Sequence, residues 1–154
     1  PFSNVNTRPW MGPKFWCPDM QGTSDGNNYK VFRYADAILM AAECLNELDR
    51  DEEALVYLNK TRNRAGIGDY TYRTHIRLQD EIRNERSREL FGEFQRKYDL
   101  VRWGTFYQVL SESTDYQART DNLKPCHEYY PIPDKEVVYS KYALDNKAYN
   151  ACGL

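Results

Sequence analysis

The feature that most constrains this fold is the stretch of residues 84–104, NERSRELFGEFQRKYDLVRWG, and the helical pattern that leads into it. Leu78, Ile82 and Leu90 fall on one apolar stripe at helical spacing. Arg86 lies on the same stripe. Because an unpaired buried charge is very costly, Arg86 needs a carboxylate or a carbonyl group as its partner. We therefore expect a partly buried ionic network at a helix–helix junction, with a structural rather than a catalytic role.

Acidic residues also recur at every fourth position of this stretch: Glu81, Glu85, Glu89 and Glu93. Like charges at that spacing repel, and neighbouring basic residues at spacings of three and four offset the repulsion (Arg88, Arg96, Lys97). A solvated, salt-bridged face is the ordinary interpretation of such a helix. The position of Arg86 favours a network instead, and we expect its partner to be Glu43 or another acid of the preceding helices. The expected members of the network are Glu43, Glu85, Arg86 and Glu89.

Length and charge narrow the class of protein. A chain of 154 residues fits a single domain, and 41% hydrophobic content is enough for a packed core. A net charge of −2 without a basic block argues against a nucleic-acid partner. No apolar run approaches the ~20 residues that span a membrane. The sequence starts at Pro1 without methionine or a signal segment, so we expect a processed chain or an excised fragment.

Two helices joined by a short turn are predicted over residues 33–48 and 51–65. The first has an apolar stripe (Tyr34, Ile38, Ala41, Leu45, Leu48), and the second has a set of residues that we expect to face its partner (Ala54, Leu55, Leu58, Thr61, Ala65). Asp51 is the expected N-cap of the second helix, and Gly66 ends it. A turn this short requires an antiparallel hairpin. The small and large core positions of a tetratricopeptide repeat have the same relative spacing as Ala42, Leu45, Ala54 and Leu58.

A third helix is predicted from about Thr74 to residue 91, and Gly92 marks a bend or break before a fourth helix that ends near Trp103. Residues 106–124 are polar and aperiodic. Pro131 and Pro133 predict an extended strip that docks on a preformed surface, and the remaining residues read as coil. The fold class is therefore mainly all-α, with tetratricopeptide-like hairpins and long irregular loops. We divide one domain, residues 1–154, into an irregular segment (1–32), a helical core (33–104) and a loop with a docked C-terminal coil (105–154).

The irregular first segment holds the candidate ligand-binding residues Arg8, Trp10 and Trp16. Aromatic rings beside guanidinium and amide groups are typical of sites that grip a sugar ring. The alternative, which we favour, is that these aromatic side chains fix a long loop to the helical body.

The cysteines and histidines do not predict a metal or cofactor site. Cys126, His127 and Glu128 are consecutive, and consecutive side chains diverge, so we reject a metal site there. Cys44 lies in a helical apolar pattern and is expected to be a buried thiol. The remaining cysteines allow one disulfide in an oxidising compartment, with its pairing left open (Cys17, Cys126, Cys152).

Several segments, in this order, resemble the C-terminal part of the SusD/RagB family: RYADAILMAAECLNEL, ALVYLNKTRNRAG, NERSREL…FQRKYDLVRWG and YYPIP. The resemblance implies an outer-membrane lipoprotein at the cell surface that binds glycans or other nutrients for a TonB-dependent (SusC-like) transporter. It implies attachment to the membrane only through a lipid anchor outside this chain, and ligand loops that lie mostly upstream of it. Where the family has a small residue followed by Phe-Glu-Gly, this chain has Phe91-Gly92-Glu93-Phe94.

Two other functions were weighed against nutrient binding. A tetratricopeptide-type protein–protein scaffold without a carbohydrate site is the alternative that stays open. An enzyme is rejected, because a glycosidase needs two carboxyl groups across a cleft and the acids here are interleaved with arginine on helices. No nucleophile motif, phosphate loop or metal-ligand helix occurs in the sequence.

Overall fold

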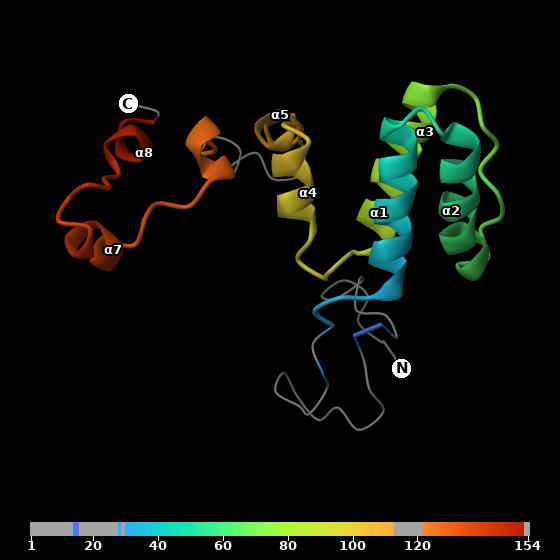
Figure 1. The fold of residues 1–154 in the computed structure, drawn as a ribbon, viewed down its shortest axis with the longest axis horizontal. Helices are drawn as coiled ribbons and strands as arrows, with labels where there is room; N and C mark the ends of the chain where they lie inside the picture. Colours follow the sequence, from blue (N-terminus) through green and yellow to red (C-terminus); the bar gives the residue numbers. More distant parts are fainter. Residues whose placement is uncertain (1–13, 16–27, 29, 113–121, 153–154) are drawn as a thin grey trace. The chain divides into compact units, whose positions relative to one another are not determined.

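The computed structural model describes residues 14–15, 28, 30–112 and 122–152, and these residues divide between two units, Pro1–Arg33 and Tyr34–Leu154. In the first unit the ammonium group of Lys30 donates to the carbonyl of Lys14 at 2.5 Å and lies 5.9 Å from the ring centroid of Phe15. Every regular element that the structure describes is helical and lies in the second unit (Figure 1). The all-α prediction is thereby confirmed, whereas the single domain of residues 1–154 stays a prediction. The elements are α1 (Tyr34–Glu47), α2 (Asp51–Arg64), α3 (His75–Glu89), α4 (Arg96–Arg102), α5 (Phe106–Ser111), the 3₁₀ turn η1 (Pro125–Glu128), α7 (Asp134–Tyr139) and α8 (Lys147–Ala151).

The core is formed by α1, α2 and α3, which all pack against one another. The helices α1 and α2 form the predicted hairpin, and Asp49 in the turn between them has a left-handed φ of 58°. Thr74 caps α3 by accepting a hydrogen bond from the backbone N–H of Arg77 at 3.3 Å. Each helix of the hairpin contributes one leucine and one alanine to the buried apolar core, and α3 contributes two large side chains (Leu39, Ala42, Ala54, Leu58, Leu78, Ile82).

The buried face of α1 is not the predicted apolar stripe. Tyr34 and Leu48, at the ends of that stripe, are 77% and 65% exposed. The face turned to the core instead carries polar side chains, because these side chains find ionic or amide partners there (Asp36, Glu43, Asn46). The buried face of α1 is therefore mixed, with these polar side chains beside Leu39 and Ala42.

Two further expectations for the hairpin are wrong. Asp51 is the first residue of α2 and not its cap, and Arg50 at the cap position makes no capping side-chain bond. The Asp51 carboxylate is engaged elsewhere, since it accepts from Asn46 at 2.7 Å and from Tyr72 at 3.0 Å. Cys44 is an exposed free thiol and not a buried one, because it belongs to the face of α1 that turns away from α2 and α3.

The break between α3 and α4 lies where Gly92 predicts it. Gly92 has a φ of 76° and Phe94, two residues later, has a φ of 60°. Glycine adopts this left-handed region at little cost, whereas a phenylalanine there is strained. The stripe of α3 that leads into the break is buried as expected, from Leu78 through Arg86 to Leu90.

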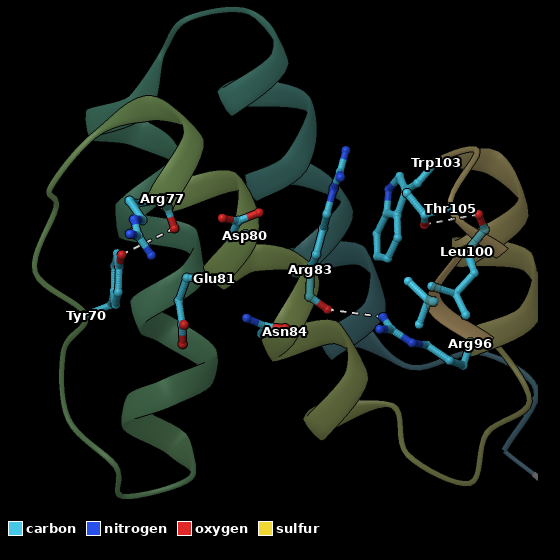
Figure 2. A pocket seen from close by; sticks show the side chains of 11 residues that line it. Tyr70, Arg77, Asp80, Glu81, Arg83, Asn84, Arg96, Leu100, Trp103 and Thr105 are labelled. Atoms are coloured by element: carbon cyan, nitrogen blue, oxygen red, sulfur yellow. Dashed lines mark hydrogen bonds between the residues drawn. The ribbon is translucent and has the colours of Figure 1, made fainter. Parts of the chain in front are cut away.

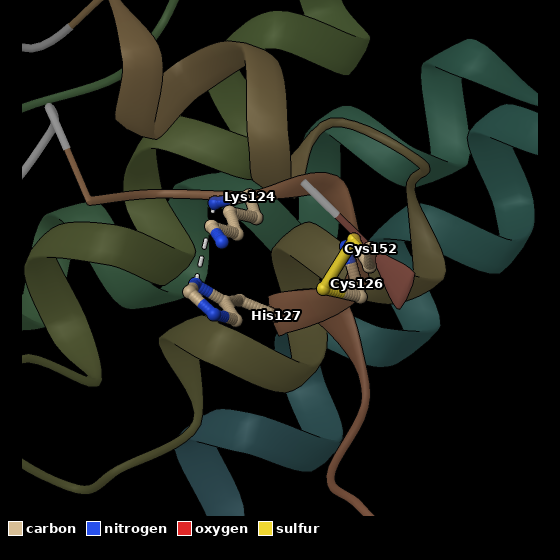
Figure 3. The surroundings of a disulfide bond; sticks show 4 residues. All are labelled: Lys124, Cys126, His127 and Cys152. Carbon is tan, nitrogen blue, oxygen red and sulfur yellow. Dashed lines mark hydrogen bonds between the residues drawn. A yellow bond between two sulfur atoms is a disulfide. The ribbon is translucent and has the colours of Figure 1, made fainter. Parts of the chain in front are cut away.

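Short helical turns occupy regions where the sequence predicts loop or coil: α5, η1, α7 and α8. Ile132 lies in the extended strip, and its backbone forms two hydrogen bonds of 2.8 Å with the Asn146 side chain, one in each direction. A disulfide joins Cys126 to Cys152, with their Cα atoms 5.9 Å apart (Figure 3). Cys17 lies outside the described residues. The strip is therefore tied to the C-terminal segment by a side-chain amide and a covalent link.

The left-handed residues of the α3–α4 junction give a stability prediction. We expect Phe94→Gly to raise the free energy of unfolding by about 0.5–1 kcal/mol, because it relieves backbone strain at a side chain that is 75% exposed. Gly92→Ala should lower the free energy of unfolding by about 1 kcal/mol, since its φ disfavours any β-carbon. Urea denaturation measures both. If both substitutions changed the free energy of unfolding in the same direction and by the same amount, this account of the junction would be contradicted.

Candidate functional site

The Arg86 guanidinium joins three helices through a buried cluster of charges. It donates to the Asp36 carboxylate of α1 at 2.8 Å and to both oxygens of the Asp99 carboxylate of α4 at 3.0 Å. All three side chains are buried, and Arg86 itself is 3% exposed. Such a fork-to-fork pair fixes geometry as well as charge. The partner that α1 supplies to Arg86 is thus Asp36 and not Glu43.

Glu43 joins the cluster through α4 instead. Its carboxylate accepts from the Arg102 guanidinium at 2.5 and 2.7 Å and from the indole N–H of Trp103 at 2.7 Å. Arg102 also donates to Asp99 at 2.9 Å, so that Glu43 and Arg86 are linked through two intervening residues. We call this set the α1–α3–α4 network: Asp36, Glu43, Arg86, Asp99, Arg102 and Trp103.

The network shifts the pKa values of its members. Burial raises the pKa of Glu43, but the hydrogen bonds from Arg102 and Trp103 outweigh it and hold the pKa below the ordinary value. The hydrogen bond to Glu43 raises the pKa of Arg102 above its ordinary value. Both groups are therefore more strongly held in their charged forms than they would be in water.

The other predicted acids belong to a second network, between α2 and α3. Glu85 is bound by Arg88 at 2.7 Å and lies 3.6 Å from Arg62 of α2. Glu89 accepts from Arg64 of α2 at 2.5 Å. The four residues predicted as one ionic network are therefore distributed over two helix junctions.

Several members of the α1–α3–α4 network were not predicted from the sequence: Asp36, Asp99, Arg102 and Trp103. One signal was present in α1, where Asp36 and Glu43 are separated by two helical turns and therefore share a face. The predicted ligand residues Arg8, Trp10 and Trp16 lie outside the described residues, so that their role stays a prediction.

Two hollows flank α4. A pocket of about 350 Å³ opens between α3 and α4, and Figure 2 shows Arg83 of α3 beside the ring of Trp103. A groove of about 730 Å³ lies between α1 and α4, and its apolar lining includes Met40, Leu48 and Tyr98. The α1–α3–α4 network separates the two, since Trp103 lines the pocket while Glu43 lines the groove.

A family model described as the SusD family matches residues 6–149. The chain belongs to the SusD family. It is 36% identical over 155 residues to SusD-like protein P25 of Formosa agariphila, covering 92% of this chain and 28% of that protein. It is 34% identical over 139 residues to SusD-like protein P2 of the same bacterium, covering 81% of this chain and 26% of that protein. The chain therefore spans little more than a quarter of these relatives, and no solved structure matches it.

The segments that carry the SusD resemblance supply both halves of the buried cluster. RYADAILMAAECLNEL contributes Asp36 and Glu43, whereas the segment ending in DLVRWG contributes Asp99, Arg102 and Trp103. The resemblance thus lies in residues that hold three helices together.

Replacing Arg86 with methionine tests the network. We expect Arg86→Met to lower the free energy of unfolding by about 3–5 kcal/mol, because it leaves two buried carboxylates without their shared partner. Urea denaturation measures the change. Arg50→Met is the control, because its bond to Glu53 joins two side chains that are each about half exposed, so that its effect on stability should be far smaller. Similar losses in the two variants would mean that Arg86 is effectively solvated.

The Glu43 pKa predicts how stability changes with pH. Since the pKa is lower in the folded than in the unfolded chain, the unfolded chain binds more protons between the two values. Glu43 therefore contributes its full stability above its ordinary pKa of 4.5, and this contribution is lost as the pH falls through the folded value. Thermal unfolding at a series of pH values should show a shallower acid dependence for Glu43→Gln than for the wild type. If the melting temperatures of the two proteins fell in parallel as the pH was lowered, Glu43 would not contribute to the acid dependence of stability.

Proposed function

We propose that this chain is the helical framework of a cell-surface protein that binds a nutrient, expected to be a glycan, for a TonB-dependent outer-membrane transporter. The observation that carries the proposal is the SusD-family match over residues 6–149. Proteins of this family are non-catalytic binding proteins, and the proposal requires no cofactor or metal. Because the chain spans only part of its relatives, the nutrient and the transporter belong to the whole protein.

The internal geometry supports a framework role for this portion. The buried charges of the α1–α3–α4 network join these helices to one another and are paired with internal partners. Groups paired in this way have reduced capacity for a ligand. On this proposal the nutrient is held mainly by loops upstream of α1, with Arg8, Trp10 and Trp16 as candidate contributors from the first segment.

The proposed location is the outer surface of the outer membrane, reached through a lipid anchor outside this chain. No helix in the described part of the chain is long and apolar enough to cross a membrane. The Cys126–Cys152 disulfide supports an oxidising compartment, because cystines are rare in the cytosol.

A tetratricopeptide-type scaffold is the second candidate, and the groove between α1 and α4 favours it. Met40 and Leu48 are 39% and 65% exposed there, and Tyr98 of α4 is 62% exposed. Exposed apolar grooves between helices are common protein-binding surfaces. This function would need neither a glycan nor a transporter.

Affinity purification in the native bacterium tests the proposal. The longest reading frame that contains this chain is tagged, and membrane complexes are purified in mild detergent. We expect a TonB-dependent transporter to co-purify in near-equal amount, and the tagged protein to be cleaved by proteinase K on intact cells. A periplasmic protein serves as the protected control in the cleavage assay.

The outcomes separate the two candidates. A tagged protein that resists cleavage in intact cells, and that purifies without any TonB-dependent transporter, would exclude the proposed function. Stoichiometric recovery of a different protein through the α1–α4 groove, lost in Leu48→Glu, would favour the scaffold.

A further inference from the structure

The pocket between α3 and α4 contains positive charge that the described residues leave unneutralised. Arg83 extends from α3 so that its guanidinium lies 5.0 Å from the ring centroid of Trp103 (Figure 2). Its Nε atom is buried and has no hydrogen-bond partner among the residues the structure describes. Buried N–H groups in native proteins are nearly always hydrogen-bonded, so this donor is available to an acceptor that enters the pocket.

Arg96 approaches the same ring from α4. Its guanidinium lies 5.6 Å from the Trp103 centroid, and its Nη1 atom donates to the backbone carbonyl of Arg83 over a long 3.4 Å. Burial lowers the pKa of Arg96, and repulsion from Arg86 adds to this, while Asp99 offsets part of the shift. The Arg96 side chain is exposed overall, and within the described residues it forms no ion pair with a carboxylate.

The acids at the pocket do not supply that compensation. Glu81 is already held by Arg62 at 2.7 Å and by Arg88 at 2.5 Å. Asp80 is exposed, and within the described residues it forms no ion pair with Arg83 or Arg96. The excess charge of the pocket is therefore positive, and an anion is the ligand class that would balance it.

We propose that this pocket binds an acidic monosaccharide unit, with Arg83 and Arg96 paired to its carboxylate or sulfate group. Guanidinium groups match the planar geometry of a carboxylate and donate two parallel hydrogen bonds to it. The amide of Asn84 and the hydroxyl of Thr105 line the same pocket and can bond sugar hydroxyls. The saccharide class rests on the proposed function, whereas the need for an anion rests on the arginines alone.

The size and polarity of the pocket favour a single sugar unit over a larger ligand. A volume of about 350 Å³ lies near the lower end of the range for small-molecule sites. The ring of Trp103 forms one wall, and most of the remaining lining is polar. A neutral sugar of the same size would offer neither guanidinium group a charged acceptor, so we expect strong discrimination by charge.

Titration of the full chain with D-glucuronate at pH 7 tests the proposal, with D-glucose as the neutral probe of the same ring size. The readouts are the NMR shift of the Trp103 indole N–H and calorimetric affinity. We expect saturable binding of glucuronate and at least tenfold weaker binding of glucose. Arg83→Gln should weaken glucuronate binding about tenfold, because it removes one partner of a charge-assisted pair. Asp80→Asn should tighten binding severalfold, because it removes a negative charge from the lining of the pocket.

Arg73→Gln is the matched control, since it removes one positive charge from an exposed loop residue that does not line the pocket. The affinity of the Arg73→Gln variant for glucuronate should equal that of the wild type. Should Arg83→Gln fail to fold, the Asp80→Asn comparison decides, because Asp80 is a surface residue without a structural bond among the described residues.

Three results would overturn the proposal: equal binding of glucose and glucuronate, no effect of Asp80→Asn, or inorganic sulfate and acetate shifting Trp103 with the same affinity as glucuronate. The last result would make the pocket a simple anion site without sugar recognition. Failure here together with recovery of the TonB-dependent transporter would remove this pocket but leave the proposed function intact. Glucuronate binding to the chain, with no TonB-dependent transporter recovered, would exclude the proposed function but leave the pocket as a binding site.

Discussion

The buried guanidinium of Arg86 is the interaction on which the arrangement of α1, α3 and α4 depends. Helix α4 has only seven residues, too short to bury a large apolar face of its own. It is positioned instead by Asp99 bonded to Arg86 and by Arg102 bonded to Glu43. Buried ion pairs add little net stability because desolvation offsets their attraction, but they accept few alternative geometries. The cluster therefore specifies where α4 lies more than how strongly it is held.

This arrangement explains which parts of the fold could be predicted from the sequence. The stripe of α3 was predicted correctly, with Arg86 in it, because large apolar residues surround the charge at regular helical spacing. The buried side of α1 was not predicted correctly, because several of its buried positions carry polar side chains: Asp36, Glu43 and Asn46. Acids and amides on a helix are normally solvated, and their burial is costly unless partners on other helices bond to them. The partners of Asp36 and Glu43 are 50 to 60 residues distant in the chain, so that local periodicity cannot reveal them.

The short elements after α4 were missed for a different reason. Helices of five or six residues, such as α5, α7 and α8, are too short to show a hydrophobic period, and isolated turns of this length are unstable. They are held by contacts that sequence cannot place, such as the disulfide of Cys126 and the paired hydrogen bonds between Ile132 and Asn146. The α3–α4 junction was easier to predict, because a glycine such as Gly92 directly indicates a left-handed backbone conformation. The left-handed conformation of Phe94 could not be anticipated from the sequence.

Trp103 connects the buried cluster to the pocket beside it. Its indole N–H is bonded to Glu43, which fixes the ring from one side, while Arg83, Arg96 and Arg102 surround the ring at 4.8–5.6 Å. A ring held in this way does not reorient when a ligand arrives, so that little conformational entropy is lost on binding. Arg102 is paired with the carboxylates of Glu43 and Asp99 and supports the structure, whereas Arg83 and Arg96 form no ion pair within the described residues. One aromatic side chain thus separates charge that is internally neutralised from charge that is available for recognition.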